Sequence, residues 1–481
     1  MIPFDPRDAL LSDLRASLGD RHVLTDPDVT APYRVESRGL YRGEALAVLR
    51  PGSTAEVARA VRLCAAARVP VVAQGGNTGL TGGGVPGGGV VLSLERLTRV
   101  RGVDTVNASL TVEAGAILAD VQAAADAAGM LFPLTYGSRG SARIGGSVST
   151  NAGGLNVLAF GNTRELVLGL EVVLADGRVW DGLRGLRKDN AGYDLKHLFI
   201  GAEGTLGIVT AAVLKLFPKP RSVGVAVVGL GSARAALDLF VHLRARADRD
   251  LTAFEYLPPF ALEIVLRHVH GAVRPLAGDH AAYALIEVSS SRPQADARAD
   301  LEAALADALE GGLIEDAAIG TSGAQNDGLW RLREGVPEAQ TREGASIKHD
   351  VSVPLSALPE FLERASAACV AAMPGLRPCG FGHFGDGNIH FNLTQPPGMD
   401  RDAFLARWGD FNRIVHDIVH ALGGSIAAEH GVGLIKRDEM ALYADPVGLD
   451  VMRRLKRALD PEDLLNPGKV LPRAADAPAG P

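Results

Sequence analysis

The chain has 481 residues, of which 47% are hydrophobic, 22% charged and 5% aromatic, a composition typical of a globular protein with two or more domains. The formal net charge of −7 and the lack of a Lys/Arg run exclude the electrostatic signature of a nucleic-acid-binding protein. The three cysteines form no CxxC spacing, which excludes an iron–sulfur motif and a disulfide framework. Because no apolar run is long enough for a membrane span and the N-terminus lacks a signal-peptide pattern, we expect a cytoplasmic enzyme.

Helical and extended segments alternate through the first part of the chain. An amphipathic helix comes first, and a strand, a second helix and a short buried strand follow it. Ser53 can cap the second helix, since Glu56 lies three residues further on. Asp176-Gly177 stands between two apolar runs and predicts a β-hairpin.

The order of elements predicts an α+β protein with more than one domain. We expect a first domain over residues 1–219 with its core at 42–219, ending near a Pro-Lys-Pro sequence. A second domain with alternating strands and helices covers residues 220–420. A helical segment at 421–474 and a disordered tail at 475–481 complete the prediction.

The segment at residues 74–89, QGGNTGLTGGGVPGGG, contains nine glycines in sixteen residues. It is no P-loop, because no Gly-Lys-Ser/Thr follows the glycines. Gly82, Gly84 and Gly87 match the spacing of a dinucleotide fingerprint, but that motif must open a helix, and here the strand-like VVLSL follows. A strand–loop–strand turn whose bare amides bind an anion fits better.

A flexible linker is the alternative interpretation of this loop, but two apolar strands flank it and it is not serine-rich. Gln74, Asn77 and Thr78 offer side-chain hydrogen bonds within the loop. Two further stretches, at residues 136–162 and 201–209, are also rich in glycine. The three glycine stretches together predict one extended ligand, such as a dinucleotide, that contacts several loops.

The second half contains a cluster of candidate metal ligands in GFGHFGDGNIHFNL and AAEHGVGLIKR. If IHFNL is a strand, His390 and Asn392 project from the same face. His383, His390 and Glu429 would form an open divalent-metal site, and His430 next to Glu429 is a candidate general base. A histidine that is only a satisfied polar residue of the fold is the alternative for each imidazole.

Basic residues between positions 330 and 350 are candidates for binding a carboxylate. A guanidinium such as that of Arg333 can form two parallel hydrogen bonds with a carboxylate, and Lys348 adds a point charge. A solvated charged helix face is the simpler interpretation for Arg331 and Arg342.

Several separated motifs resemble a known family. PGSTAEV, AQGGNTGLTGGG, IGGSVSTNAGG and GAEGTLGIVT are similar to the FAD-binding domain shared by vanillyl-alcohol oxidase and para-cresol methylhydroxylase. Together with the C-terminal motifs, they resemble the FAD-linked D-2-hydroxyacid dehydrogenases, which include D-lactate dehydrogenase, D-2-hydroxyglutarate dehydrogenase and the flavin subunit of glycolate oxidase. The resemblance covers roughly residues 45–471 and implies a two-subdomain FAD-binding domain at 1–219 and a substrate-binding cap domain at 220–420.

The resemblance implies FAD, held without a covalent bond, in place of NAD. It places the pyrophosphate on the first glycine stretch, the isoalloxazine on the second, and adenine or ribose on the third. The C-terminal LLNPGKVL would return to this domain near the ring or a phosphate, and plain packing of the C-terminus is the alternative role for this segment. The cofactor-binding residues that it implies are Gly75, Gly76, Asn77, Thr78, Gly79, Leu80, Ser138, Gly140, Ile144, Gly145, Ser149, Thr150, Asn151, Gly153, Gly154, Glu203, Gly204, Gly207, Ile208, Val209, Asn466 and Lys469.

The same resemblance assigns His383, His390 and Glu429 to a metal, zinc or manganese, with zinc expected. Arg333 and Lys348 match positions that bind the substrate carboxylate, and Asn392 and His430 match substrate-contacting positions. Relatives specific for D-2-hydroxyglutarate commonly carry Thr four residues after the matched Arg, where this chain has Pro337.

We therefore expect a dehydrogenase that oxidises a D-2-hydroxyacid, D-lactate or D-2-hydroxyglutarate, with His430 removing the hydroxyl proton and hydride passing to flavin N5. The flavin subunit of a multi-chain glycolate oxidase and a non-catalytic nucleotide- or metal-binding module are the alternatives. The expected electron acceptor is an electron-transfer flavoprotein, a cytochrome, a quinone or an iron–sulfur subunit. We also expect a homodimer and no nucleic-acid partner.

Overall fold

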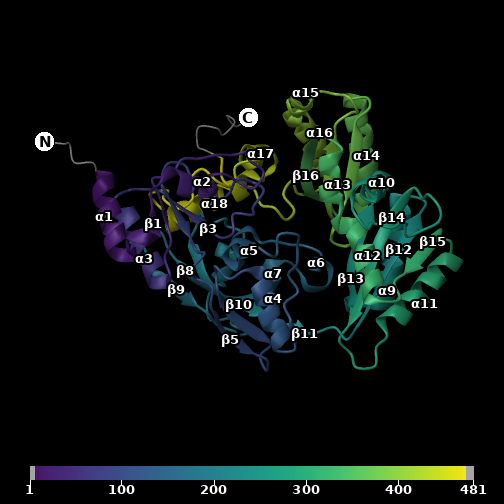
Figure 1. The fold of residues 1–481 in the computed structure, drawn as a ribbon, viewed down its shortest axis with the longest axis horizontal. Coiled ribbons are helices and arrows are strands. Elements are labelled where there is room, and N and C mark those ends of the chain that lie inside the picture. The colour runs from purple at the N-terminus through teal and green to yellow at the C-terminus, as the bar shows by residue number, and fades with distance from the viewer. Residues whose placement is uncertain (1–5, 473–481) are drawn as a thin grey trace. The chain divides into compact units, whose positions relative to one another are not determined.

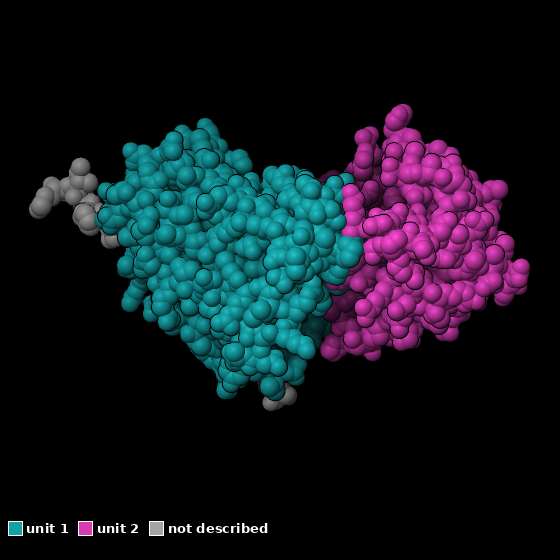
Figure 2. All heavy atoms as spheres, turned by 90° about the horizontal axis from the view of Figure 1, so that it is seen from below, with its two compact units in different colours: residues 1–153, 161–218, 429–481 teal, residues 154–160, 219–428 magenta. Residues whose placement is uncertain are grey.

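The computed structural model describes residues 6–472 and divides the chain into two compact units (Figure 2). Unit 1, teal in Figure 2, comprises residues 1–153, 161–218 and 429–481, and unit 2, magenta, comprises residues 154–160 and 219–428. Each unit contains both helices and sheets, so the predicted α+β class is confirmed. Within the described residues, no helix has the length and apolar character needed to cross a membrane.

Unit 1 begins with a small sheet of buried strands. Its strand order is β1 (Val23–Leu24), β2 (Ala47–Leu49), β4 (Val90–Ser93) and β3 (Val71–Gln74). The β2–β4 and β3–β4 pairs are parallel. Because β2 and β3 run in the same direction, the chain must cross back between them, and helix α3 (Thr54–Ala66) makes this connection. Helix α1 (Pro6–Leu18) packs on α3 (Figure 1). The predicted cap of α3 is confirmed, because the Ser53 hydroxyl accepts the Glu56 amide at 3.2 Å.

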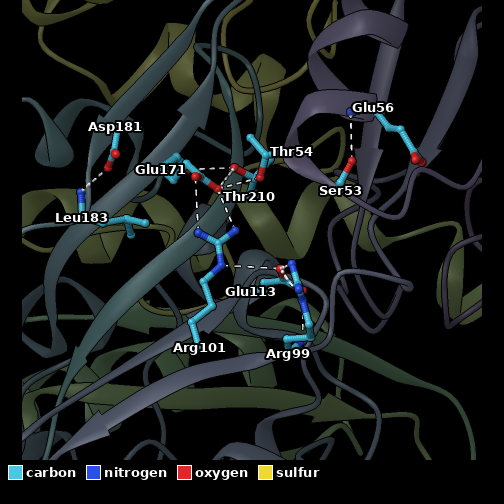
Figure 3. A network of polar contacts seen from close by, with 10 residues as sticks. All are labelled: Ser53, Thr54, Glu56, Arg99, Arg101, Glu113, Glu171, Asp181, Leu183 and Thr210. Carbon is cyan, nitrogen blue, oxygen red and sulfur yellow. Dashed lines mark hydrogen bonds and ion pairs between the residues drawn. The ribbon is translucent and has the colours of Figure 1, made fainter. Parts of the chain in front are cut away.

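The second sheet of unit 1 is antiparallel and contains a polar network (Figure 3). Its order is β5 (Val100–Asp104), β6 (Ser109–Glu113), β10 (Ile208–Lys215), β8 (Val167–Val173) and β9 (Val179–Gly182). Arg101 on β5 donates to Glu171 on β8 at 3.0 Å and lies 3.4 Å from Glu113 on β6. Glu171 also accepts hydrogen bonds from the hydroxyls of Thr210 at 2.9 Å and Thr54 at 2.6 Å. Since Thr54 is the first residue of α3, this network connects helix α3, which joins two strands of the first sheet, to the second sheet.

The predicted hairpin of unit 1 is confirmed: Val173 of β8 pairs with Val179 of β9, and Gly177 in the turn has φ 75°. A two-stranded ladder joins β11 to β7. The other elements of unit 1 are η1 (Asp20–His22), α2 (Pro27–Arg34), α4 (Leu118–Ala127), β7 (Met130–Leu131), α5 (Ile144–Thr150), α7 (Thr163–Leu166), α8 (Lys196–Phe199), β11 (Phe217–Pro218), α17 (Arg437–Tyr443) and α18 (Pro446–Leu459).

Unit 2 contains two antiparallel sheets. The four-stranded sheet has the order β13 (Leu251–Leu257), β14 (Ala282–Ser290), β12 (Ser222–Leu230) and β15 (Asp316–Ile319). The three-stranded sheet has the order β16 (Ser346–Ser352), β18 (Asn388–Thr394) and β17 (Arg377–Phe381). A bridge between Tyr256 and Gly382, with hydrogen bonds of 2.8 and 3.0 Å, connects the two sheets.

The core of unit 2 lies where alternate residues of the larger sheet meet α10, α12 and α13. Val227, Leu257 and Leu285 belong to this cluster, together with Leu332 of α12 and Phe381 of β17. Helices α9 and α11 pack against the same sheet (Figure 1). The remaining elements are α6 (Val157–Phe160), α9 (Ala233–Ala247), η2 (Asp248–Asp250), α10 (Pro259–His268), α11 (Ala297–Glu310), α12 (Gly323–Glu334), α13 (Val336–Arg342), η3 (Leu355–Ala357), α14 (Leu358–Ala372), η4 (Phe384–Asp386), α15 (Arg401–Leu405) and α16 (Trp408–Ala421).

The units divide the chain differently from the expected domains at three places, the smallest of which is Lys219, which belongs to unit 2. Residues 154–160 join unit 2, because α6 packs on β13. Residues 421–428 also belong to unit 2, since Ser425 exchanges two backbone hydrogen bonds with Ser352 at the end of β16. The expected tail at 475–481 lies outside the described residues.

Candidate functional site

The three glycine stretches lie together in unit 1. The first follows β3 and precedes β4, which is the predicted strand–loop–strand arrangement. A Cβ atom placed on Gly75 would lie 3.5 Å from the amide nitrogen of Gly146, so the first stretch packs on the second. The amides of Gly201 and Glu203 donate to the carbonyls of Val148 and Ser149 at 3.0 and 2.8 Å, which joins the third stretch to the second. One ligand can therefore contact all three.

The structure divides these glycines into two groups. A Cβ atom on Gly76 would lie 2.1 Å from the carbonyl oxygen of Ser141, and one on Gly145 would lie 2.8 Å from the Cβ of Ala114, so the chain itself excludes side chains there. A Cβ atom on Gly79, Gly140 or Gly146 would meet no described atom within 4 Å. Tightly packed loops that leave bare backbone open on one side fit a bound dinucleotide.

The second stretch contains a helix that the sequence pattern did not indicate. Helix α5 runs through Gly145-Gly146 and ends at Thr150, and the next residue, Asn151, has a left-handed φ of 51°. Two consecutive glycines make a helix unfavourable by local propensity, so tertiary contacts must stabilise it. The Gly145 amide donates to the Ala114 carbonyl at 2.7 Å, and Ile144 and Val148 are buried beside it.

The remaining residues expected to bind the cofactor lie on the same three stretches. Thr78 and Leu80 flank Gly79 in the first stretch, and the Asn77 amide group donates to the carbonyls of Pro32 and Val35 at 3.1 and 2.8 Å. The Asn77 side chain therefore holds the end of α2 against the loop. Those on the second and third stretches are Ser138, Thr150, Gly153, Gly204, Gly207, Ile208 and Val209, whereas Gly154 falls in unit 2.

The C-terminal segment of unit 1 packs against the first and third glycine stretches. The Asn466 side chain donates to the carbonyls of Gly83 and Glu203 at 2.9 and 2.7 Å. The Lys469 ammonium donates to the Val85 carbonyl at 2.8 Å, and burial lowers the pKa of Lys469 to about 8. Both side chains thus stabilise the first glycine stretch by donating hydrogen bonds to its main-chain carbonyls.

Glu203 connects the third glycine stretch to the segment that carries His430. One carboxylate oxygen of Glu203 accepts a hydrogen bond from the amide of Val432 at 2.7 Å, and the other accepts one from the amide of Gly433 at 2.9 Å. Burial raises the pKa of Glu203, and the two amides act in the opposite direction. Next to this contact, the Nε2 of His430 lies 3.6 Å from the Glu429 carboxylate.

In unit 2, four polar side chains share one face of the three-stranded sheet. Asp350 and Lys348 of β16 lie directly opposite His390 and Asn392 of β18. The predicted strand is confirmed, and its period of two places both pairs on the same face. The Nδ1 of His390 is 3.9 Å from the Asp350 carboxylate, and the Asn392 amide group donates to Gln340 of α13 at 2.8 Å.

A buried charge cluster lies beside this face. Arg333, on the last turn of α12, donates through Nε to the Glu255 carboxylate at 2.5 Å. The other carboxylate oxygen of Glu255 is 2.7 Å from the Nδ1 of His383. The rings of His383 and His390 lie 5.3 Å apart between centroids. Although burial alone would raise it, the pKa of Glu255 falls to about 2, because the charges and hydrogen bonds of His383 and Arg333 outweigh burial.

Sequence reasoning missed Glu255, Asp350 and Gln340. Asp350 could have been found from the alternation in SIKHDVS, which places it two residues from Lys348 on the same face. Glu255 had a weaker signal, a single acid in the otherwise uncharged strand LTAFEYL. The structure brings His383, His390, Arg333, Lys348 and Asn392 together in unit 2, while Glu429 and His430 belong to unit 1.

Comparison with solved structures defines the class of fold. The chain is similar to p-cresol methylhydroxylase, with a TM-score of 0.73 at 18% identity, covering 97% of this chain and 96% of that one. It is also similar to 4-ethylphenol oxidase from Gulosibacter chungangensis, with a TM-score of 0.71 at 18% identity and 98% of both chains covered. The fold is therefore that of the vanillyl-alcohol-oxidase type of flavoprotein.

Sequence comparison then identifies the family. Residues 45–182 match the FAD binding domain family, and residues 219–470 match the FAD linked oxidases, C-terminal domain. A protein from Xanthomonas citri pv. viticola named D-2-hydroxyglutarate dehydrogenase is 39% identical over 475 residues, which is 98% of each chain. The mitochondrial D-2-hydroxyglutarate dehydrogenase of Bos taurus is 39% identical over 455 residues, covering 94% of this chain and 82% of that one. The chain belongs to the FAD-linked D-2-hydroxyacid dehydrogenases, as the motifs indicated, and is an FAD-linked oxidoreductase.

The expectation of a cytoplasmic protein is wrong by the same comparison. Relatives from Arabidopsis thaliana and Bos taurus, and a rice relative, are named as mitochondrial proteins. The prediction failed because a missing secretory signal and a missing apolar span do not distinguish the cytoplasm from the interior of an organelle.

Proposed function

We propose that the protein oxidises D-2-hydroxyglutarate to the 2-oxoacid with FAD as the immediate electron acceptor. The names of its relatives at 39% identity support this substrate. The observation that carries the proposal is the shared face of β16 and β18, where the ammonium of Lys348 and the imidazole of His390 project from the same side. A cation there suits a substrate carboxylate, and an imidazole suits a metal that binds the α-hydroxyl.

Arg333 and Lys348 are the proposed anchors of the substrate carboxylates. Only the Nε of Arg333 is used by Glu255, and a guanidinium carries five N–H groups, so enough donors remain for a bidentate contact. Two separate cations also suit a diacid better than a monoacid such as lactate. Asn392 is held by Gln340 through its amide group, so its carbonyl oxygen keeps a defined direction toward the same face.

His383, His390 and Glu429 are the proposed ligands of a divalent metal, with zinc as the expected ion. Two imidazoles and one carboxylate are a suitable donor set with positions left for substrate. Glu429 follows Ala428 directly in the chain, and the Ala428 amide donates to the Asp350 carbonyl at 3.4 Å. A bound divalent cation would lower the pKa of a coordinated hydroxyl, as it does for water.

His430 is the proposed general base for the substrate hydroxyl, since a neutral imidazole can accept a proton through its unprotonated nitrogen. Glu203 holds the neighbouring amides of Val432 and Gly433, which restricts the segment that positions His430. FAD, when bound, supplies the acceptor for the hydride that leaves the substrate Cα. The proton goes to His430 and the electron pair leaves with the hydride, so the alcohol becomes a ketone.

A substrate screen tests this function. The purified yellow protein is mixed anaerobically with D-2-hydroxyglutarate, D-lactate, D-malate or glycolate, and bleaching of the flavin is followed; turnover is then measured with an artificial dye acceptor. We expect D-2-hydroxyglutarate to give the highest kcat/KM and its L-enantiomer to give no bleaching. Faster oxidation of D-lactate would refute the substrate assignment, and no bleaching by any D-2-hydroxyacid would refute the activity.

A further inference from the structure

We propose that Glu255 is a positioning residue whose single carboxylate orients both a metal ligand, His383, and a carboxylate anchor, Arg333. The inference rests on the proposed function, because it takes His383 as a ligand of the metal. It goes further by assigning the direction of both side chains to a residue that contacts neither substrate nor metal.

Glu255 lies in a place where an unpaired carboxylate would be strongly unfavourable. Its side chain is 1% exposed, and it shares a face of β13 with Leu257, a member of the apolar core cluster. Burying an ionised carboxylate requires hydrogen-bonded partners of opposite charge or good donors. Its two oxygens have different partners, Arg333 at 2.5 Å and His383 at 2.7 Å.

The backbone fixes the distance between Glu255 and His383. Tyr256, next to Glu255, exchanges two backbone hydrogen bonds with Gly382, next to His383, at 2.8 and 3.0 Å. The two side chains therefore project from adjacent, paired positions. A contact set by paired backbone resists the rotation that a flexible surface pair would permit.

This contact determines which nitrogen of His383 faces a metal. A carboxylate only accepts hydrogen bonds, so the Nδ1 of His383 must carry a proton, and in the neutral imidazole that binds a metal the lone pair lies on Nε2. A carboxylate that accepts from one ring nitrogen orients the ring and makes the other nitrogen a better metal ligand. The ring of His390, the second proposed imidazole ligand, lies 5.3 Å away between centroids.

Arg333 is fixed by two contacts at once. Its Nε binds Glu255, and its guanidinium carbon lies 4.9 Å from the centroid of the Phe381 ring. A guanidinium held along one edge and against an aromatic face keeps its other N–H groups in one direction. Glu255 thereby links the orientation of the substrate anchor to that of the metal ligand.

A purely structural ion cluster is the alternative, since buried charge networks also occur away from active sites. Metal affinity separates the two roles. Flavin-loaded full-length protein is stripped with a chelator and titrated with Zn²⁺ in competition with a chromophoric chelator. For Glu255→Gln we expect a Kd about 10- to 100-fold weaker at unchanged flavin content, because a carboxamide cannot accept from both partners.

Glu287→Gln is the matched control. Glu287 lies on the neighbouring strand β14 and is also bound on both oxygens, by Trp330 at 2.8 Å and Thr252 at 2.8 Å, but neither partner is a metal ligand. We expect this variant to bind Zn²⁺ as the unmodified protein does. If Glu255→Gln does not fold, Glu255→Asp keeps the charge but shortens the reach, and should weaken Zn²⁺ several-fold with a raised KM.

Equal Zn²⁺ affinity in Glu255→Gln, or in Glu255→Asp where that variant is used, and in the unmodified protein would overturn the inference. Equal weakening in the Glu255 and Glu287 variants would also overturn it, since the effect would then be general destabilisation. If the unmodified protein binds no divalent metal, the metal part of the proposed function fails first. The titration of the unmodified protein therefore distinguishes failure of the function from failure of this assignment.

Discussion

The two units hold their candidate functional groups in different ways. In unit 1 the groups are main-chain amides of three glycine stretches. The side chains of Asn466, Lys469 and Glu203 stabilise these stretches through hydrogen bonds to main-chain atoms. In unit 2 they are polar and charged side chains, and two of them, Arg333 and His383, are held by the Glu255 carboxylate, which is 1% exposed. We therefore propose that the cofactor is bound mainly by main-chain amides, whereas the substrate reaction depends on charged side chains. Variants of the two units should therefore fail in different ways.

The largest effect is expected for His390→Ala in unit 2. Loss of one proposed metal ligand should lower kcat by about a thousandfold, since a metal provides several kcal/mol of charge stabilisation. Flavin content should not change, because FAD is assigned to unit 1. Flavin absorbance, metal analysis and turnover check this. His280→Asn is the control, since His280 also binds a carboxylate, Glu315 at 2.6 Å, outside the site; retained turnover in His390→Ala would contradict the metal role.

Arg333→Met should cause the largest loss of stability in the site. Removing the guanidinium leaves the Glu255 carboxylate buried without its cation, which costs about 3–5 kcal/mol of unfolding free energy. Lys348→Met, at a half-buried position on β16, should raise KM with a smaller change in stability. Chemical denaturation and KM measurements distinguish the two variants. If Arg333→Met is as stable as Lys348→Met, the buried pair has been misassigned.

Two alanine substitutions in the first glycine stretch of unit 1 distinguish a glycine needed for packing from one proposed to contact FAD. In Gly76→Ala, a Cβ atom 2.1 Å from the Ser141 carbonyl should destabilise the unit by about 1–3 kcal/mol. In Gly79→Ala the Cβ atom would meet no described atom within 4 Å, so stability should change little while FAD affinity falls. Thermal unfolding of the flavin-free protein and FAD titration measure both. Full FAD affinity in Gly79→Ala would remove this glycine from the site.

The smallest effect is expected at Glu343, a half-buried carboxylate of unit 2 that lies outside the site. Hydrogen bonds from His268, Arg377 and Arg267 lower the pKa of Glu343 to about 2. A lowered carboxyl pKa adds stability above the unfolded value of 4.5, and this contribution is lost as pH falls from 4.5 toward 2. The stability difference between the unmodified protein and Glu343→Gln should shrink over that window, with kcat unchanged at neutral pH. A difference independent of pH would contradict the ion pairing.

The sequence predicted those parts of the site that depend on local pattern. The loop between two strands, the Asp176-Gly177 hairpin and the shared face of His390 and Asn392 follow from turn residues and strand alternation. Helix α5 could not be predicted, because Gly145-Gly146 disfavours a helix and burial overrides that preference.

Contacts between residues far apart in the chain could not be predicted from local sequence patterns either. Glu255 lies 128 positions from His383 and 78 from Arg333, and their contact depends on the bridge between two sheets. Gly76 and Gly79 look alike in the sequence, yet the chain crowds one and leaves the other open. Such differences are determined by what packs around a residue, which a single sequence does not display.

The most direct test of the contrast between the units is the rate of anaerobic flavin reduction per bound FAD, measured with D-2-hydroxyglutarate in Gly79→Ala and His390→Ala. We predict that Gly79→Ala binds less FAD but reduces what it binds at the rate of the unmodified protein. His390→Ala should bind a full complement of FAD and reduce it about a thousandfold more slowly. Slow reduction in Gly79→Ala together with fast reduction in His390→Ala would contradict the division of roles.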